Sequence, residues 1–576
     1  MKNQDNKVLY TLSSSNPDSH FIEIEMRLQN KEGRDLMQFY LPVWRPGRYE
    51  LADYAKNIQS IRFFSARGAE LPFEKISKSC WEVEAHGVEE VVVKYTYYAN
   101  QLDAGAAYVD STQLYVNPVN CCLYTLEHSY NAIELTLNIP ANYIVATGLQ
   151  KVKKNVFSAL SFDQLADSPF IASATLQSKS YKVRETTFSV WFQGECQPDW
   201  ENVLSDFKKF TNEQMLVFGG FPVIEYHFLF QILPVKAYHG VEHCTSTVIA
   251  LGPGCDLMKG KLYENFLGIS SHELFHAWNI KAIRPLEMYP YDFQQENYSR
   301  LGYVSEGVTT YYGDLMLVRS GVISNDDYFK LLNQTFDNHF YNYGRLNQSV
   351  ADASFDTWLD GYSKGIPNRK VSIYTEGSLN ALIFDLQIRK LSGGKRSLDS
   401  VMKKLYKDFA LENCGYTETD FKKLLTEAAG KDLSQIFEKY TYGTEDYFTK
   451  LNESLKYVGC HLKSIDNTQH SASVFGFRVD ADAKVVDVAP ASPAYLAGIT
   501  RGDEVVGVNG LAIEKNKAAD WITYFNDNVK VTFKKDNRLM DILLKAGKEK
   551  YFSAARIEKS KSISKEQEEA FKEWLG

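Results

Sequence analysis

The run His272-Glu273-Leu274-Phe275-His276 limits more than any other feature how this chain of 576 residues can fold. In an α-helix, positions i and i+4 lie on one face about one turn apart, so the run predicts a helix that presents two imidazoles side by side. Two neutral imidazoles at this spacing can bind one Zn²⁺ ion. Glu273 is offset by about 100° around the helix axis, so it cannot join them as a ligand, but it can accept a proton from a metal-bound water. The run therefore predicts a catalytic zinc site.

A catalytic zinc site needs a third protein ligand and leaves one position for water. We expect Glu306 to be that ligand, because Ser305 is a natural N-cap residue and would place Glu306 in the first turn of a helix. From there its carboxylate can point across to the helix that bears the two histidines. Glu287, Asp292 and Glu296 are closer in sequence. They lie in a segment rich in Pro and Tyr that is less suited to rigid ligation, and they are weaker alternatives.

The tetrapeptide Gly240-Val241-Glu242-His243 follows a segment, residues 226–233, that is expected to be a strand. An edge strand can bind an extended peptide through its backbone, and a carboxylate at its end can pair with the α-ammonium group of that peptide. This interpretation makes Glu242 the group that binds a free amine, with Gly240, Val241 and His243 beside it. The alternative is that Glu242 is an ordinary surface carboxylate.

Tyr374 stands just before a helix that Thr375 is expected to cap and that Gly393 and Gly394 are expected to end. A phenol hydroxyl at this position could donate a hydrogen bond to an oxyanion as a carbonyl becomes tetrahedral. Ordinary packing of the tyrosine is the alternative.

The hydrophobic pattern divides the chain into four segments. Residues 1–176 carry short alternating runs separated by turn clusters, which predicts a β-sandwich-like domain. Residues 177–456 add strands and then a long helical region, which predicts an α+β domain. Residues 457–550 return to short strands with turn glycines, and residues 551–576 end in a charged amphipathic helix that we expect to be a solvated cap. The predicted fold class is therefore multidomain α+β.

Composition narrows the class of function. Hydrophobic residues make up 44% and charged residues 24%, as in globular proteins, and a net charge of -8 argues against a nucleic-acid protein with a basic surface. The eight cysteines form no CxxC pair. No stretch is apolar enough for a membrane span, and the N-terminus lacks the apolar core of a signal peptide. We therefore expect no nucleic-acid or membrane partner and a cytoplasmic location, or a periplasmic one if a leader has been removed.

Three segments, HELFHAWNIKAIRP, SEGVTTYY and VSIYTEGSLNALIFDL, together resemble the M61 family of metallopeptidases. These are PDZ-bearing glycyl aminopeptidases, distant relatives of the aminopeptidase N group of HExxH (gluzincin) peptidases. The N-terminal run Leu41–Gln59 also resembles the first domain of that family. The resemblance implies a thermolysin-like catalytic domain, one Zn²⁺ ion per chain, and peptide substrates with a free N-terminus, of which those beginning with Gly or Ala would be favoured.

By the same resemblance, His272, His276 and Glu306 would be the zinc ligands and Glu273 the general base. Glu242 would match the carboxylate that binds the amine of the substrate.

Tyr374 would match the tyrosine that stabilises the transition state. The sequence departs from the family pattern at His239, where a second glycine is common, and at Glu376, where a lysine is common. Neither departure removes a group that the mechanism needs, but both bear on the substrate preference.

The segment from Val474 onward resembles a PDZ domain. Phe475, Gly476 and Phe477 would form the loop whose backbone N–H groups receive the C-terminus of a peptide, a second kind of partner. The alternative is a small β domain that binds no peptide and serves as a lid or docking surface.

Together these features predict a zinc-dependent aminopeptidase that hydrolyses the N-terminal peptide bond of peptides. One alternative is an endopeptidase, or a zinc hydrolase of non-peptide substrates, on the same scaffold. The other is a binding protein whose PDZ-like module recruits peptides while the metal site is vestigial. The intact Glu273 argues against the second, because a dead site has no need of a base.

Overall fold

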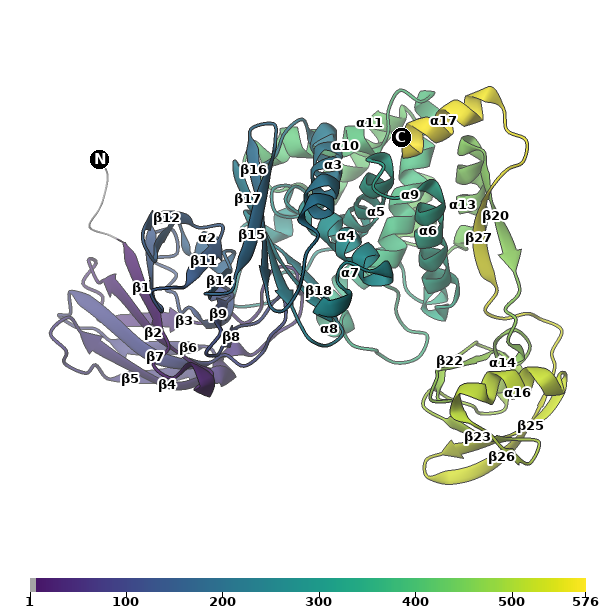
Figure 1. The fold of residues 1–576 in the computed structure, drawn as a ribbon, viewed down its shortest axis with the longest axis horizontal. Helices are drawn as coiled ribbons and strands as arrows, with labels where there is room; N and C mark the ends of the chain where they lie inside the picture. Colours follow the sequence, from purple (N-terminus) through teal and green to yellow (C-terminus); the bar gives the residue numbers. More distant parts are fainter. Residues whose placement is uncertain (1–6) are drawn as a thin grey trace.

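The computed structural model describes residues 7–576, so the first six residues of the expected N-terminal β domain lie outside it. The molecule has a β-rich N-terminal domain, a central domain built mainly of helices, and a smaller β-rich domain near the C-terminus (Figure 1). Each has a hydrophobic cluster of its own, which includes Leu12, Leu274 and Val531, respectively. The chain is therefore a multidomain protein of mixed helices and strands, as the sequence predicts.

Alternation of apolar and polar side chains builds the N-terminal domain. In β2 every second residue, from Ile22 to Leu28, is buried, and the residues between them are only partly covered. The strands form a seven-stranded sheet (β12-β13-β10-β1-β2-β7-β4), a four-stranded sheet (β11-β14-β9-β8) and a three-stranded sheet (β3-β6-β5). The elements are β1 (Val8–Ser13), β2 (Phe21–Gln29), β3 (Leu36–Tyr40), β4 (Ile58–Ser65), β5 (Phe73–Ser77), β6 (Cys80–Glu84), β7 (Glu90–Tyr98), β8 (Tyr108–Val109), β9 (Gln113–Val116), α1 (Pro118–Cys121), β10 (Ile133–Asn138), β11 (Ile144–Thr147), β12 (Gln150–Lys153), β13 (Val156–Ala159), α2 (Phe162–Ala166) and β14 (Phe170–Ser173).

The central domain starts with a five-stranded sheet of order β15-β16-β17-β19-β18. Strands β16, β17 and β19 are parallel, whereas β18 pairs antiparallel with β19 and forms an edge of the sheet. The strand predicted at 226–233 is β17, which lies inside the sheet, and Gly240, Val241 and Glu242 lie on the edge strand β18 that follows it in the sequence. The strands are β15 (Gln177–Val183), β16 (Thr186–Gln193), β17 (Glu225–Ile232), β18 (Ala237–Glu242) and β19 (Ser246–Gly252).

Helices complete the central domain, and their ends follow local capping signals. The side chain of Ser372 accepts a hydrogen bond from the backbone N–H of Thr375 (3.4 Å), so Ser372 is the N-cap of α9 and the predicted cap at Thr375 is wrong. The same helix ends at Gly393, as predicted. The helices are α3 (Trp200–Phe218), α4 (Gly260–Phe275), the π-helical segment η6 (Tyr303–Val308), α5 (Thr309–Arg319), α6 (Asn325–Phe340), α7 (Val350–Phe355), α8 (Thr357–Asp360), α9 (Ile373–Ser392), α10 (Leu398–Leu405), α11 (Glu418–Ala429), α12 (Ser434–Ile436) and α13 (Tyr447–Leu455).

The C-terminal β-rich domain is inserted between two strands that pair with each other. Strand β20 (Cys460–Ile465) leaves the central domain and pairs antiparallel with β27 (Ala554–Lys559), which returns to it (Figure 1). Between them lie the two-stranded sheet β21-β22 and the four-stranded sheet β24-β23-β25-β26. The elements are α14 (His470–Ser473), β21 (Phe477–Val479), β22 (Val485–Val488), α15 (Pro493–Leu496), β23 (Glu504–Val508), β24 (Leu511–Ala512), α16 (Ala518–Phe525), β25 (Asn528–Lys535) and β26 (Arg538–Lys545).

The last helix, α17 (Lys565–Leu575), packs into the central domain, so the expected solvated cap is wrong. Ala570, Phe571, Trp574 and Leu575 are all buried on one face of the helix. The amphipathic pattern that the sequence shows at 551–576 is thus the pattern of a packed helix, and strand β27 precedes it in the same segment.

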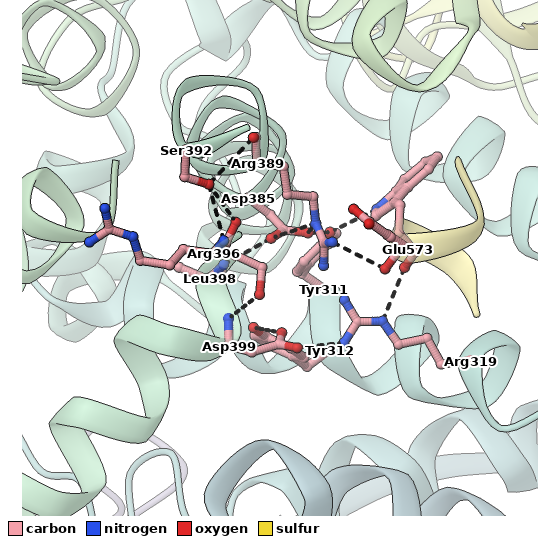
Figure 2. Close-up of polar contacts among 12 residues, drawn as sticks. Tyr311, Tyr312, Arg319, Asp385, Arg389, Ser392, Arg396, Leu398, Asp399 and Glu573 are labelled. Carbon is pink, nitrogen blue, oxygen red and sulfur yellow. Dashed lines mark hydrogen bonds and ion pairs between the residues drawn. The ribbon is translucent and has the colours of Figure 1, made fainter. Parts of the chain in front are cut away.

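Figure 2 shows how the backbone of α17 meets buried arginines. Arg389 donates to the carbonyl of Glu573 (3.1 Å), and Arg319 donates to the carbonyl of Trp574 (3.0 Å). Arg389 also contacts Asp385 on its own helix α9 (3.2 Å). The two arginines belong to α9 and α5, so the last residues of the described chain brace these two helices. No helix within residues 7–576 is long and apolar enough to cross a membrane.

Candidate metal centre and substrate groove

Two histidines and one glutamate meet at the C-terminal end of α4. The Nε2 atoms of His272 and His276 lie 3.1 Å apart. The Oε2 atom of Glu306 is 3.3 Å from Nε2 of His276 and 3.7 Å from Nε2 of His272. One potential ligand atom from each residue lies within 4.8 Å of the other two. The structure thus brings together the three residues that the sequence singles out as ligands.

Glu306 reaches the histidines from a π-helical turn, η6, that continues directly into α5. Ser305 is therefore inside a helix and is not the N-cap that the sequence suggests. A π-helical turn adds a residue to the ordinary helical repeat and is common at functional sites, because it redirects side chains. Gly307 lies against Gly377 of α9 so closely that a Cβ on either residue would overlap the backbone of the other segment. This close crossing holds Glu306 beside the start of α9.

Asn279 connects the histidine helix to η6. Its backbone carbonyl lies 2.8 Å from Nδ1 of His276, and its side-chain amide donates to the carbonyl of Val304 (2.8 Å) and to Oγ1 of Thr309 (3.0 Å). A carbonyl can only accept, so Nδ1 of His276 carries a proton in this contact, and Nε2 is the ring atom that faces His272 and Glu306. No local pattern distinguishes Asn279 from a loop asparagine, so this role could not be predicted from the sequence.

These residues fit a bound zinc ion. The two Nε2 atoms face each other at 3.1 Å beside the carboxylate of Glu306, and a metal cation can accept a lone pair from each of these three groups. Two imidazoles and one carboxylate are a donor set of catalytic zinc sites, which leave further positions open. His272, His276 and Glu306 are therefore suited to hold the metal.

Glu273 lies beside the three ligands and against the edge strand. A Cβ on Gly240 would overlap its Oε1 atom, so β18 approaches this carboxylate as closely as only a glycine allows. The side chain is buried, and its Oε2 atom has no hydrogen-bond partner among residues 7–576. One oxygen of Glu273 is thus packed against the strand and the other is free to exchange a proton.

The site is strongly acidic, and its ionisable groups shift one another's pKa values. Burial raises the pKa of Glu273 well above its ordinary value, and the carboxylates of Glu242 and Glu306 add to this, while His276 opposes it. Burial acts in the same direction on Glu306, but His276 and His272 outweigh it and lower the pKa of that carboxyl. Three buried acids in one site favour a cationic ligand.

Glu242 ends strand β18 and points into the same site. It is 4% exposed, and its Oε1 atom has no hydrogen-bond partner among residues 7–576. Glu242, Glu273 and His276 also bring potential ligand atoms within 4.8 Å of one another. The N-terminal domain covers the carboxylate with Gly47, where a Cβ would overlap it. Glu242 is thus a buried acid with an unused oxygen next to the metal ligands.

The neighbours of Glu242 turn toward the N-terminal domain instead. Val241 packs in a cluster with Tyr115, and Nδ1 of His243 lies 3.1 Å from Asp167. The same aspartate accepts a hydrogen bond from Lys281 (2.7 Å). The side chains of Val241 and His243 therefore join the two domains, and among the four predicted groups Gly240 and Glu242 face the site.

Tyr374 lies in the first turn of α9, with its ring 6.4 Å from that of His272. Burial raises the pKa of its phenol well above the usual value, and Glu306 adds to the effect. Two further tyrosines face the same region. Tyr362 accepts a hydrogen bond from the backbone N–H of Tyr49 (3.2 Å), and Glu306 adds to burial in raising the pKa of both phenols. The sequence carries no local signal for these two.

The remaining candidates lie elsewhere. Glu287 and Asp292 are exposed, Asp292 caps the backbone of Gln294 (2.8 Å), and neither these two nor Glu296 joins a group of potential metal ligands in residues 7–576. Glu376 is buried in the first turn of α9, where it pairs with His339 of α6 (2.6 Å).

The expected carboxylate-binding loop in the C-terminal domain has few free donors. The backbone N–H groups of Phe475 and Gly476 donate to the carbonyls of His470 (3.0 Å) and Ala472 (3.2 Å). The side chains of Phe475 and Phe477 are buried in the core of the domain. A peptide terminus at this loop would have to displace both hydrogen bonds.

Two family models and a solved structure are similar to this chain. A family model described as the Peptidase M61 N-terminal domain matches residues 9–174, and one described as M61 glycyl aminopeptidase matches residues 265–380. No curated protein matches the sequence. The crystal structure of an aminopeptidase N family protein from Idiomarina loihiensis is 26% identical, with a TM-score of 0.89 over 99% of this chain and 100% of that one.

An M1 zinc metallopeptidase from Deinococcus radiodurans is 14% identical, with a TM-score of 0.45 over 77% of this chain and 95% of that one, a likeness too low to bear on function. The two family models cover separate parts of the site. The first includes the loop at Gly47, and the second includes His272, Glu306 and Tyr374. The chain belongs to the M61 family of metallopeptidases.

Proposed function

We propose that this metallopeptidase is a zinc-dependent aminopeptidase that hydrolyses the first peptide bond of peptides with a free N-terminus. The observation that carries the proposal is the buried carboxylate of Glu242, which has an unused oxygen and lies within 4.8 Å of potential ligand atoms of Glu273 and His276. A buried carboxylate without a partner is costly, and an α-ammonium group would satisfy it. Peptides held by their amine at this point can present only their first peptide bond to the metal.

His272, His276 and Glu306 would hold the zinc ion. When bound, zinc supplies Lewis acidity, which acidifies a water molecule and polarises a carbonyl group. Oε2 of Glu273 is the free atom that accepts the proton of the attacking water and then delivers it to the leaving amine. Burial raises its pKa, which favours uptake of the proton that is later delivered to the leaving amine.

Tyr374 would donate its phenol proton in a hydrogen bond to the oxyanion of the tetrahedral intermediate. Its raised pKa keeps the hydroxyl protonated, which this role requires. Edge strand β18 would align the peptide backbone, and the absence of a side chain at Gly240 lets that backbone come close to Glu273.

Small first residues, Gly or Ala, are the proposed preference. The matched family is described as M61 glycyl aminopeptidase, which supports this choice. We also propose that the N-terminal domain is sandwich-like, the central domain thermolysin-like and the inserted domain PDZ-like, with limits near residues 176, 456 and 550. Two N–H groups of its loop are already bonded within the chain, which argues against a peptide C-terminus as a partner there.

A substrate panel tests the proposal. The zinc-loaded protein is incubated with Gly- and Ala-p-nitroanilide, their N-acetylated forms, and an internally quenched peptide blocked at both ends. We expect hydrolysis of the free-amine anilides only, complete loss of activity with a chelator, and recovery when zinc is restored. Cleavage of the acetylated anilides or of the blocked peptide at a similar rate would contradict the aminopeptidase assignment and indicate an endopeptidase.

A further inference from the structure

The N-terminal domain places one buried cation next to the edge strand. Arg45 is 4% exposed. Its Nη1 atom donates to the carbonyl of Pro46 (3.1 Å), and its Nη2 atom lies 3.4 Å from Nε2 of His239 on β18. Within residues 7–576, no carboxylate comes within the 4.0 Å of an ion pair with this guanidinium. Asp103 is close to it, but its carboxylate accepts from the backbone N–H of Gly105 (2.7 Å) and is 3.9 Å from His239.

A buried guanidinium without an ion pair is unusual. Moving a charged side chain from water into the protein interior costs roughly several kcal/mol unless the charge is paired and hydrogen-bonded. Other buried cations differ in this respect: Lys281 pairs with Asp167 (2.7 Å) and Arg319 pairs with Asp399 (2.9 Å), whereas Arg284 has no ion pair within residues 7–576 and lies over the ring of Tyr291. Arg45 is left with two neutral acceptors. Its surroundings therefore point to an anion that binds there.

Room for such an anion exists beside it. Arg45 and His239 line a cavity of about 440 Å³ between the N-terminal domain and β18. Arg48 and Lys56 line the same cavity, so three cations stand against two acids, Glu50 and Asp103. Arg48 is already paired with Glu50, which leaves Arg45 as the buried cation available to a ligand.

His239 prepares the guanidinium for this role. Burial, reinforced by Arg45, lowers the pKa of His239 to about 4, so the imidazole is neutral near neutral pH. A neutral imidazole can accept the hydrogen bond from Nη2 of Arg45 and so fix the plane of the guanidinium fork. His239, which stands where a glycine is common in the family, thus gives Arg45 a hydrogen-bond acceptor.

The loop that bears Arg45 follows β18. Gly47 covers Glu242 at one end, and Arg45 contacts His239 at the other. Glu242 and His239 are three residues apart on the strand, which corresponds to about 10 Å. An extended tripeptide spans about the same length. The edge strand therefore has an acid beside the metal ligands and, about one short peptide away along the strand, a contact with a cation.

We propose that Arg45, oriented by His239, binds the C-terminal carboxylate of short peptide substrates whose free amine lies on Glu242. This rests on the aminopeptidase function proposed above and narrows its substrates to peptides of two or three residues. Arginine is suited to the task, because its fork can bind a carboxylate through two parallel hydrogen bonds.

The first test varies the substrate and leaves the protein unchanged. Zinc-loaded protein is assayed with Ala-Ala-Ala, with its C-terminal amide, and with penta-alanine as acid and amide. A charge-assisted pair makes kcat/KM for the tripeptide acid exceed that for its amide by about tenfold or more, and the pentapeptides should show no such ratio. Equal rates for tripeptide acid and amide would overturn the proposal.

The second test varies Arg45. In Arg45→Met the ratio of kcat/KM for tripeptide acid over amide should fall to near one, mainly through KM, and Arg45→Lys should keep part of it. Arg62→Met is the control, because Arg62 is an exposed arginine of the same domain that lines no part of this cavity. If Arg45→Met slows acid and amide equally and leaves the ratio unchanged, the arginine is merely structural.

A binding measurement separates this proposal from the proposed function. Calorimetry on zinc-loaded Glu273→Gln compares Ala-Ala-Ala with its amide, with and without Arg45→Met. Tighter binding of the acid that disappears with Arg45→Met supports the carboxylate site, even if the parent protein hydrolyses no anilide and the aminopeptidase function fails. Active hydrolysis of Ala-p-nitroanilide with no preference for the acid in either assay supports the function and rejects the site.

Discussion

At the scale of single residues, Glu242 and Glu273 are chemically alike and are given different tasks by their surroundings. Both are buried and both keep one oxygen without a partner in residues 7–576. Glu273 follows His272 on α4, so it is fixed next to the ligands, whereas Glu242 ends an edge strand along which a peptide can lie. Position, and not residue type, separates a proton acceptor from an amine-binding group.

Glu273→Gln should abolish turnover and leave zinc bound. The amide keeps the size and hydrogen-bonding capacity of the side chain but cannot take the proton, so we expect kcat to fall by about 10³-fold or more. The measurement pairs kcat for Ala-p-nitroanilide with the zinc content of the purified variant. Loss of zinc from this variant would show that Glu273 is needed for ligation and would refute its role as the base.

Glu242→Ala should act mainly on KM for substrates with a free amine. Removal of the carboxylate deletes a charge-assisted pair, which is commonly worth about 2 kcal/mol, so an increase in KM of roughly 10- to 100-fold is expected. The check is a steady-state series on Ala-p-nitroanilide and on its des-amino analogue, propionyl-p-nitroanilide. A variant in which both substrates slow by the same factor has lost its structure and not an amine site.

At the scale of secondary structure, the metal centre depends on two helices that touch through glycines. Gly307 in η6 and Gly377 in α9 meet backbone to backbone. Glu306 precedes the first glycine, and Tyr374 lies one turn before the second. Any side chain at the crossing must therefore move the carboxylate and the phenol relative to each other.

Gly307→Ala should weaken zinc binding without touching a ligand. The added methyl group overlaps Gly377, and relief of the overlap separates η6 from α9, at a cost in unfolding free energy of about 1–3 kcal/mol. Gly268→Ala in α4 is the matched control, because a Cβ there meets no atom within 4 Å. That control should raise stability by about 0.5–1 kcal/mol, as for an unhindered helical glycine. Zinc titrations and thermal unfolding of both variants check the contrast; equal zinc affinities would contradict it.

The features of these helices that can be predicted from the sequence are those set by residues close together in the chain. The spacing of His272 and His276 is a signal within one helical turn, and the structure places both imidazoles together. Glu306 arrives at the same point although the predicted N-cap at Ser305 is wrong, because a continuous π-helical turn positions it instead. Such a turn is imposed by packing across Gly307 and has no signature in the neighbouring residues.

Contacts between distant segments could not be predicted. Arg45 and Asn279 are separated from the residues they meet by a domain boundary or by a helix end, and neither lies in a periodic pattern. Strand β18 is not predicted from the sequence, because its six residues include a glycine, a histidine and a glutamate and so resemble a loop. Pairing with β19 decides its conformation.

At the scale of the whole molecule, a buried ion cluster joins the N-terminal domain to the back of the metal centre. Asp167 comes from the N-terminal domain, and Lys281 and His243 come from the central domain. Burial raises the pKa of Asp167, but Lys281 and His243 outweigh it and hold that pKa well below its usual value. The cluster lies directly behind Glu242.

Stability should therefore depend on pH through Asp167. Because its folded pKa is depressed, the contribution of Asp167 is fully present above its unfolded pKa of about 3.9 and is lost as pH falls toward the folded value. Asp167→Asn leaves Lys281 buried and unpaired, at a cost of about 3–5 kcal/mol near pH 7. The difference in thermal midpoint between parent and variant, measured from pH 7 down to pH 3, should narrow below about pH 4. A difference that stays constant over this range would exclude an ionised Asp167 from the cluster.

The inserted domain leaves and rejoins the central domain through neighbouring residues, since Ile465 at the end of β20 pairs with Ala554 at the start of β27. A short hairpin between these two positions would close the chain after excision of everything between them, and α17 would still reach its place against Tyr311. The same junction would accept an unrelated folded module in exchange, so the catalytic unit can be given a new targeting partner without redesign of its core.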